Sequence, residues 1–294
     1  MTIKEVLKKY NKVEIELLLA HILKKPREFL YLNPERKLTN KQFGNLAKYI
    51  RRREKGEPIA YILGYKDFMG LRIKVNKDVL IPRPETEGMV EYVVQALGLP
   101  AVKTAKQQAT GLPYKNTVSI LDIGTGSGCI AIAIAKQLQN LKFQISNLKL
   151  TAIDISSAAL KVAKANAKYH QTKIKFIKSD LLTNIKGNFD IIVANLPYVP
   201  ETDYTKLKNN LNYEPKKAIF AKNKGLFVIE KFLKQLHKSK ILNQKSKIYL
   251  EFDPRQKKEL AKLIKKILPG YRAEFFKDLN NFWRFVKIKH SNIL

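Results

Sequence analysis

Apolar residues in the first part of the chain recur at helical spacing. Segment 13–23 carries them on more than one side of a helix, as expected for a helix inside a small bundle. Thr39 is a suitable N-cap for a second helix, and Gly56 is a suitable residue to end it. The pattern therefore predicts a helical domain over residues 1–56.

The pattern changes to an alternation of period two over residues 57–83. In the segment 71–75 apolar residues alternate with charged ones, which is typical of a β-strand with one buried face. Gly64 and Gly70 stand where the chain would have to turn. We therefore expect a β-hairpin linker in this region.

A helix is expected to begin at Pro84 and to continue to about Leu97. Proline suits the first turn of a helix, and Glu85 and Glu87 interact favourably with the positive end of the helix dipole. Residues 98–116 have no regular period and are expected to form an irregular insertion.

Beyond residue 117, segments with the features of strands and of helices alternate. The predicted strands cover 118–124, 148–156, 173–182, 189–198 and 247–252, followed by a strand pair within 271–289. The predicted helices cover 128–138, 157–170, 225–238 and 256–268. This order predicts an α/β fold, with a Rossmann-like, mostly parallel sheet and helices on both faces, as a domain over residues 84–294. Ligands of such sheets bind at the carboxyl ends of the strands.

The charge of the chain is strongly positive but has two readings. The 294 residues include 56 Lys and Arg against 25 Asp and Glu, which gives a net charge of +31. A basic surface suits contact with nucleic acid, so proximity to RNA or the ribosome is one reading. However, 46 of the basic residues are Lys and only 10 are Arg, beside abundant Asn and Ile. An AT-rich genome favours the codons of this mixture, so codon bias is the other reading.

Other features of the composition narrow the class of protein. No apolar run approaches the ~18 residues that a membrane span needs, and the first ten residues lack the apolar core of a signal peptide. Cys129 is the only cysteine, and the four histidines are far apart in the sequence. We therefore expect a cytoplasmic protein with no disulfide, no membrane segment and no metal site.

The segment from Asp122 to Gly128 is a candidate for ligand binding, and we call it the glycine loop. It lies between a predicted strand and a predicted helix. Gly124, Gly126 and Gly128 allow a tight turn and a close approach of a ligand, and Thr125 and Ser127 stand between them. This GxGxG spacing resembles the first motif of class I methyltransferases, which holds S-adenosylmethionine. The alternative is a tight structural turn.

Polar residues also end the next two predicted strands. Asp154 ends the second strand, where a carboxylate can accept hydrogen bonds from a ribose diol. Asp180 and Leu181 end the third strand. The resemblance to methyltransferases implies that this position faces the adenine, where Asp180 could accept its amino protons and Leu181 could pack beside its ring. For both aspartates the alternative is a helix cap.

The segment Asn195-Leu196-Pro197-Tyr198, which we call the asparagine loop, follows the fourth predicted strand. It resembles the (N/D)PPY motif of enzymes that methylate amide or exocyclic amino nitrogens. The lone pair of such a nitrogen is delocalised, so the nitrogen is a poor nucleophile. The Asn195 side-chain oxygen and the Leu196 carbonyl could each accept one N–H of the target, and Tyr198 could pack against its plane. All four residues are therefore candidate catalytic and substrate-binding residues, and Asn195 also adjoins the expected cofactor site.

Over nearly its whole length the chain resembles the PrmC/HemK family of glutamine methyltransferases, which modify peptide-chain release factors. The resemblance is carried by the two motifs above and, most specifically, by Ile81-Pro82-Arg83-Pro84-Glu85-Thr86-Glu87. Further matches are Gly56-Glu57-Pro58-Ile59-Ala60-Tyr61, Phe68-Met69-Gly70-Leu71, Tyr213-Glu214-Pro215 and Gly225-Leu226.

The resemblance implies a function, a cofactor and partners. The substrate would be the glutamine of the Gly-Gly-Gln loop of class 1 release factors, and the methyl donor would be S-adenosylmethionine. Arg83 and Glu85 would lie on the substrate-binding side, and residues 1–56 would recognise the substrate. A monomer is expected.

Three features depart from the family pattern, and three alternatives stay open. Leu196 stands where the motif has proline, Glu251-Phe252-Asp253 stands where the family has Glu-Ile-Gly, and the insertion at 98–116 is unusual. The alternatives are the sister enzyme that methylates a glutamine of a large-subunit ribosomal protein, an rRNA adenine N(6)-methyltransferase, and an inactive fold that only binds RNA or protein. The rRNA enzymes place the catalytic domain first, unlike this chain.

Overall fold

The computed structural model describes residues 1–10, 13–97, 117–140 and 147–291. Contacts between residues divide the chain into two compact units, Met1–Lys66 and Asp67–Leu294. The expected insertion at 98–116 lies outside the described residues. In the part of the chain that is described, no helix is long and apolar enough to cross a membrane.

The first unit is a bundle of short helices around an apolar core. Its helices are α1 (Ile3–Tyr10), α2 (Val13–Leu23), α3 (Glu28–Leu32), α4 (Asn40–Glu54) and α5 (Ile59–Leu63). Thr39 caps α4 as predicted: its hydroxyl accepts from the Gln42 backbone N–H at 3.2 Å, and the Gln42 side chain accepts from the Thr39 N–H at 3.0 Å. The core consists of aliphatic side chains, among them Leu18, Leu19, Leu30 and Leu46.

A two-stranded sheet of β1 (Tyr65–Phe68) and β2 (Leu71–Lys74) forms the predicted hairpin. The preceding segment 59–63 is a helix, α5, within the region that was expected to be a hairpin linker. Strand β2 belongs to the second unit, where a buried side chain holds it: the Asn166 amide bonds the Lys74 N–H and C=O at 2.9 Å each and donates to the Ser127 C=O at 2.8 Å. Asn166 therefore couples β2 to the glycine loop.

The centre of the second unit is a seven-stranded sheet in the order β10-β11-β9-β6-β3-β4-β5. Its strands are β3 (Thr117–Ile123), β4 (Asn147–Asp154), β5 (Lys175–Lys178), β6 (Phe189–Ala194), β9 (Leu242–Glu251), β10 (Tyr271–Lys277) and β11 (Trp283–His290). The strands from β9 to β5 pair in parallel, and β11 is antiparallel to both of its neighbours. The predicted, mostly parallel sheet is therefore confirmed.

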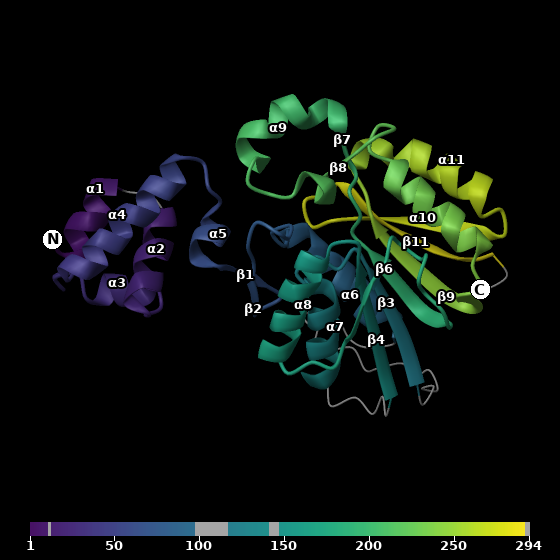
Figure 1. Ribbon diagram of the computed structural model, residues 1–294, viewed down its shortest axis with the longest axis horizontal. Coiled ribbons are helices and arrows are strands. Elements are labelled where there is room, and N and C mark those ends of the chain that lie inside the picture. The colour runs from purple at the N-terminus through teal and green to yellow at the C-terminus, as the bar shows by residue number, and fades with distance from the viewer. Residues whose placement is uncertain (11–12, 98–116, 141–146, 292–294) are drawn as a thin grey trace. The chain divides into compact units, whose positions relative to one another are not determined.

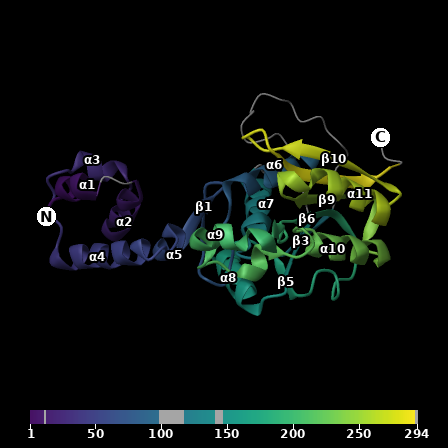
Figure 2. The same cartoon turned by 90° about the horizontal axis from the view of Figure 1, so that it is seen from above.

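Helices cover both faces of this sheet, as predicted. Helices α6 (Glu87–Ala96), α7 (Cys129–Asn140) and α8 (Ser157–Tyr169) pack against one another on one face, and α10 (Phe227–Lys238) and α11 (Lys257–Ile267) form the layer on the other (Figures 1 and 2). Helix α9 (Tyr204–Leu211) and the short strands β7 (Val199–Pro200) and β8 (Phe220–Ala221) lie beyond the carboxyl ends of the central strands (Figure 1). The β-α alternation thus brings the loops after β3, β4, β5 and β6 to one edge.

Candidate active site

The glycine loop connects β3 to α7 through residues with positive φ. The φ angles of Gly124, Gly126 and Gly128 are 69°, 55° and 83°, in the left-handed region that favours glycine. A Cβ on Gly124 would lie 3.3 Å from the Leu196 side chain, and a Cβ on Gly128 would lie 3.2 Å from that of Ala163. The loop therefore needs glycine both for its turns and for close packing.

Thr125 and Ser127 are buried inside this turn. The Thr125 hydroxyl donates to the Asp122 carboxylate at 2.6 Å, so it supports the loop from beneath. Burial raises the pKa of Asp122 to about 7, although the hydrogen bond from Thr125 lowers this pKa. We assign these residues to the support of the loop, whereas Gly124 and Gly126 face the pocket and Gly128 is buried.

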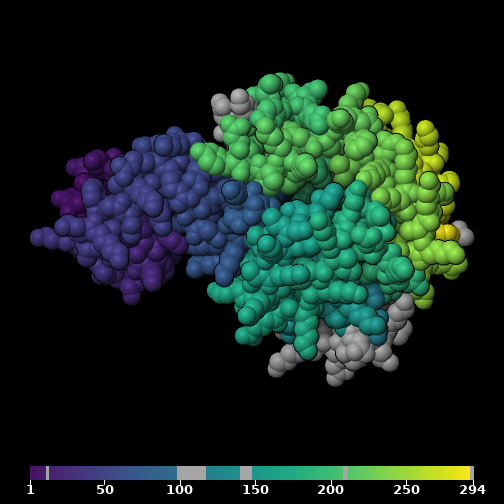
Figure 3. Space-filling view, in the orientation of Figure 1, coloured from purple at the N-terminus to yellow at the C-terminus, as the bar shows by residue number. Residues whose placement is uncertain are grey.

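A pocket of about 530 Å³ lies at the carboxyl ends of β3, β4, β5 and β6. It appears as a hollow between the green part around residues 200–220 and the teal part around residues 150–180 (Figure 3). The predicted site residues that line it are Gly124, Gly126, Asp154, Asp180, Leu181, Asn195, Leu196 and Pro197. Residues far apart in the sequence are thus brought to one cavity, as predicted for a site at this edge of the sheet.

Asp154 faces the pocket from the end of β4 and also fixes the glycine loop. Its carboxylate accepts from the Gly126 N–H at 2.9 Å and from the Ser156 N–H at 2.8 Å, one bond to each oxygen. Burial raises its pKa, while these backbone hydrogen bonds lower it. Each oxygen can accept a further bond, which is what a ribose diol would donate.

Asp180 and Leu181 form a strained turn at the end of β5. Leu181 has φ of 53°, and the Ser179 hydroxyl holds the turn by donating to the Leu181 carbonyl at 2.7 Å. The Asp180 carboxylate pairs with the Lys231 ammonium at 2.5 Å, and both side chains line the pocket. Only one carboxylate oxygen of Asp180 is taken by this pair, so the other can accept an adenine amino group.

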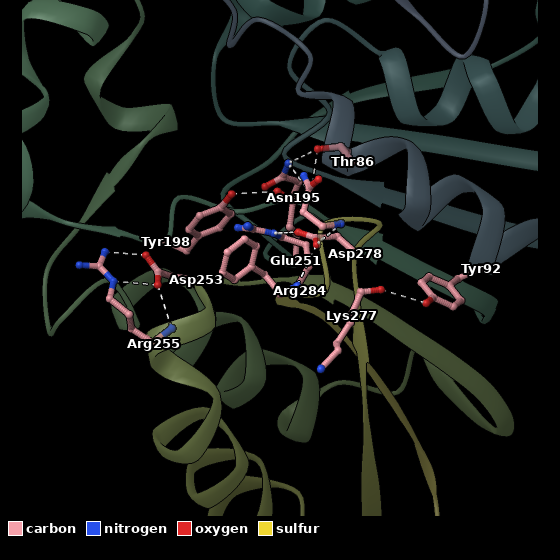
Figure 4. Close-up of polar contacts among 12 residues, drawn as sticks. Thr86, Tyr92, Asn195, Tyr198, Glu251, Asp253, Arg255, Lys277, Asp278 and Arg284 are labelled. Carbon is pink, nitrogen blue, oxygen red and sulfur yellow. Dashed lines mark hydrogen bonds and ion pairs between the residues drawn. The ribbon is translucent and has the colours of Figure 1, made fainter.

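The asparagine loop begins where β6 ends, and the Asn195 side chain is held by two partners. The Asn195 Nδ2 donates to the Thr86 hydroxyl at 3.1 Å and to a Glu251 carboxylate oxygen at 3.0 Å (Figure 4). The Thr86 hydroxyl in turn donates to the same Glu251 oxygen at 2.8 Å. Among the described residues, neither the Asn195 Oδ1 nor the Leu196 carbonyl has a hydrogen-bond partner. These two oxygens are the acceptors that the sequence predicted for a target NH₂ group.

Tyr198 closes the loop and does not line the pocket. Its hydroxyl donates to the other Glu251 oxygen at 2.8 Å (Figure 4). Burial and the Glu251 carboxylate raise the pKa of Tyr198 well above its usual value, so the hydroxyl keeps its proton. The Tyr198 carbonyl accepts from the Gln256 side chain at 2.7 Å, and a Cβ on Gly225 would lie 2.0 Å from that carbonyl oxygen. Gly225, with φ of 87°, is therefore required by the loop.

Arg83 and Glu85 lie outside the residues that line the pocket. The Arg83 guanidinium pairs at 2.7 Å with Glu214, whose other oxygen accepts from the Ile81 N–H at 2.9 Å. Glu214 is buried, so this pair fixes the segment around Arg83 against the segment of Tyr213-Glu214-Pro215. The segments Ile81–Glu87 and Tyr213–Pro215, which both match the family, are therefore in contact.

The sequence did not single out Glu251 or Thr86 as parts of the site. Glu251 is 1% exposed and accepts hydrogen bonds from Thr86, Asn195 and Tyr198. The available signals were their places in segments compared with the family, Thr86 in Ile81–Glu87 and Glu251 in Glu251-Phe252-Asp253. Two departures from the family pattern have local explanations: the buried Leu196 side chain packs against the glycine loop, and Asp253 caps the turn at Pro254–Gln256.

The donor set of the pocket fits S-adenosylmethionine. The glycine-lined wall, which side chains would fill, matches the amino acid part of the cofactor. The carboxylate at the end of β4 matches its ribose, and the carboxylate at the end of β5 matches its adenine. In the described parts of the chain, no group of three or more His, Cys, Asp or Glu could hold a metal ion. Fold and site together define a class I methyltransferase that uses S-adenosylmethionine.

Comparisons with known proteins give the family. The "PrmC N-terminal domain" model matches residues 4–64, and the "Methyltransferase small domain" model matches residues 106–249. The release factor glutamine methyltransferase of Lactococcus lactis is 34% identical over 86% of this chain and 85% of its own length. That of Buchnera aphidicola from Acyrthosiphon pisum is 38% identical over 87% and 83%. The chain belongs to the release factor glutamine methyltransferase family.

Other relatives are longer or more distant. The bifunctional methyltransferase of Rickettsia conorii is 34% identical, and the match covers 96% of this chain but 54% of that protein. Among solved structures, a methyltransferase from Pyrococcus furiosus matches with a TM-score of 0.51 at 19% identity, over 84% of this chain and all of that one. The hMettl16 catalytic domain, solved with an RNA hairpin, matches with a TM-score of 0.55 at 15% identity, over 87% and 84%. These structures share the fold.

Proposed function

We propose that this protein transfers a methyl group from S-adenosylmethionine to the side-chain amide nitrogen of the glutamine in the Gly-Gly-Gln loop of class 1 release factors. Two relatives that match 86% and 87% of the chain, each over more than four-fifths of its own length, carry the name of this activity. The observation that carries the chemistry is the Asn195 amide, whose N–H groups are held by Thr86 and Glu251 while its oxygen has no partner among the described residues.

The cofactor would be held by residues that line the pocket. Gly124 and Gly126 leave room for its amino acid part, Asp154 would accept the ribose hydroxyls, and Asp180 with Leu181 would hold the adenine. When bound, S-adenosylmethionine supplies an electrophilic methyl group. Thr125, Ser127 and Gly128 would act through the shape of the glycine loop, since the first two are buried beneath it.

The asparagine loop would orient the target amide. The Asn195 Oδ1 and the Leu196 carbonyl each accept one N–H of the substrate NH₂ group, which directs the nitrogen lone pair into the pocket. The two acceptors also stabilise positive charge that develops on the nitrogen, and no strong base is needed because the proton can leave after transfer. Pro197 restricts Leu196 to extended geometry and so fixes the direction of its carbonyl. Tyr198 would contact the plane of the target group.

The substrate would bind beyond the pocket through other parts of the chain. Arg83 and Glu85 lie in the segment just before α6, where the pair with Glu214 fixes the backbone. The helical domain, residues 1–56 as predicted from the sequence, would add affinity for the release factor. A release factor acts on the ribosome, so the reaction would take place in the cytoplasm. The basic surface would be close to RNA for part of the time, and the enzyme would act as a monomer.

Methyl transfer from labelled cofactor tests this function directly. The purified protein is mixed with a release factor, with its Gly-Gly-Gln glutamine changed to alanine, with the large-subunit ribosomal protein of the sister activity, and with rRNA. We expect label in the unchanged release factor alone. Label in the alanine variant would place the target elsewhere, and label only in the ribosomal protein or the rRNA would replace the proposed substrate.

A further inference from the structure

We propose that Glu251 and Thr86 are positioning residues that fix the orientation of the Asn195 amide. This inference rests on the proposed function, because it assigns a task to the Asn195 oxygen. It follows from the direction of each hydrogen bond in a group of four side chains, of which Thr86 and Glu251 are buried and Asn195 and Tyr198 are partly buried (Figure 4). We call this group the amide clamp.

The proton count of the amide clamp permits one arrangement. A hydroxyl has a single proton, and the Thr86 proton goes to Glu251 at 2.8 Å. Toward Asn195 the Thr86 oxygen can then only accept. Its partner at 3.1 Å must be the NH₂ group of the Asn195 amide, which also reaches Glu251 at 3.0 Å. Both amide protons are used in this way, so the amide oxygen must face away from Glu251.

The fold brings these side chains together across long sequence separations. Strands β6 and β9 pair in parallel with Ala194 opposite Leu250, so the residues that follow, Asn195 and Glu251, are neighbours. Thr86 comes from the turn before α6 and is 2% exposed. Water is thus kept from Thr86 and Glu251, and a buried carboxylate with three protein donors has few other partners to exchange with.

The amide clamp also affects the strength of the Asn195 oxygen as an acceptor. A carboxylate that accepts from one end of an amide polarises it and increases the negative charge on the oxygen at the other end. That oxygen would contact a nitrogen that becomes positive as it is methylated. The amide clamp is therefore expected to favour the transition state more than the bound substrate.

Glu251→Gln keeps the size of the side chain but replaces an acceptor by an NH₂ donor. The amide clamp then has one acceptor oxygen in place of two, and the negative charge that polarises the Asn195 amide is lost. We expect turnover to fall about 10- to 100-fold, as is typical when a residue that orients a catalytic group is changed, with KM for the release factor and affinity for the cofactor within about threefold of the unchanged protein.

Thr86 gives a second, milder pair of variants in case Glu251→Gln does not fold. Thr86→Ser keeps the hydroxyl and should keep most of the turnover. Thr86→Val keeps the shape but removes the acceptor of one Asn195 N–H, so turnover should fall while Thr86→Ser remains close to the unchanged protein. Equal rates for these two variants would contradict the amide clamp.

A double-mutant cycle separates orientation from general stability. If Glu251 acts through Asn195, Glu251→Gln should lower turnover by less than about twofold in an Asn195→Ala background. The matched control is Asp278→Asn: the Asp278 carboxylate is 4% exposed and pairs with Arg284, but it does not contact Asn195. This control should leave turnover unchanged. If Glu251→Gln lowers turnover equally in the unchanged protein and in the Asn195→Ala background, the proposal is overturned.

One measurement does not depend on activity. The Asn195 side-chain NH₂ gives an ¹H–¹⁵N NMR signal, assigned by its loss in Asn195→Ala. We expect slow hydrogen exchange for this signal in the unchanged protein and fast exchange in Glu251→Gln or, if that variant does not fold, in Thr86→Val. Fast exchange in the unchanged protein would contradict the amide clamp, whereas slow exchange together with no methylation of a release factor would contradict the proposed function instead.

Discussion

At the scale of single residues, the Asp154 carboxylate has two roles, one observed in the structure and one proposed. One is structural, because its oxygens accept the N–H groups of Gly126 and Ser156. The other is the proposed contact with the ribose of the cofactor. A single residue therefore fixes the shape of the glycine loop and, in the proposed complex, would add to the affinity of the pocket for the cofactor.

Asp154→Ala should weaken the binding of S-adenosylmethionine. Hydrogen bonds to a charged group contribute about 1.5–3 kcal/mol, so the loss of one or two corresponds to at least a tenfold weaker affinity. Calorimetric titration of the cofactor measures this, with Asp278→Asn as the control that should bind normally. An affinity within twofold of that of the unchanged protein would contradict the ribose assignment.

At the scale of elements, Gly225 controls how closely the turn before α10 approaches the asparagine loop. A side chain there would meet the Tyr198 carbonyl oxygen at 2.0 Å and the Gln256 amide at 2.3 Å. Both groups hold the end of the loop that carries Asn195. The fold thus uses one close backbone approach to position the asparagine loop.

Gly225→Ala should lower both stability and turnover. Gly187 is a matched control: its φ of 95° is similar to the 87° of Gly225, but a Cβ there would meet nothing within 4 Å. Gly187→Ala should cost about 1–2 kcal/mol of unfolding free energy from backbone strain alone and keep its turnover. Gly225→Ala should cost more and reduce turnover at least tenfold, as is typical when a positioning group is displaced. Chemical denaturation and single-turnover rates check this, and equal behaviour of the two variants would argue against the close approach.

The sequence predicted the strands and helices of the sheet domain because each has a clear period. Segment 204–211 is the helix α9 that was not predicted, since it is short and mostly polar, with only Tyr204, Leu207 and Leu211 apolar. At the site, the predicted Asp154, Asp180 and Asn195 share one pocket because each follows a parallel strand. The amide clamp could not be predicted in the same way: Glu251 is 56 residues from Asn195 in sequence, and local patterns contain no information on such pairs.

The stability of the whole molecule should depend on pH through Asp122. Its pKa is about 7 in the folded protein and about 3.9 in an unfolded chain. The folded state therefore binds more protons between these values, and its stability falls as the pH rises from about 4 to about 7. Asp122→Asn removes this contribution, which is on the order of 2–4 kcal/mol at pH 8. Denaturation curves at pH 5 and pH 8 should show a smaller loss of stability for the variant, and an unchanged loss would contradict the shifted pKa.

The two-unit division of the whole molecule predicts separate roles for binding and chemistry. A shortened chain that starts at Tyr65 keeps the hairpin and the entire second unit. Circular dichroism first checks that the shortened chain is folded. Its KM for the release factor should then rise about tenfold or more, which corresponds to the loss of about 1.4 kcal/mol of binding free energy. Its kcat should stay within a few-fold of that of the full chain. An unchanged KM with lost turnover would assign chemistry to the helical unit.

The central claim is that the Asn195 oxygen holds the glutamine nitrogen during methyl transfer. The most direct test is the single-turnover rate of release factor methylation by Asn195→Ala, together with its affinity for the cofactor and with Asn280→Ala, an exposed asparagine, as the control. Loss of one preorganised group at such a site lowers the rate about 10²- to 10³-fold, so we predict a loss of this size with cofactor binding nearly unchanged. A rate above about a tenth of that of the unchanged protein would contradict the role of the asparagine loop.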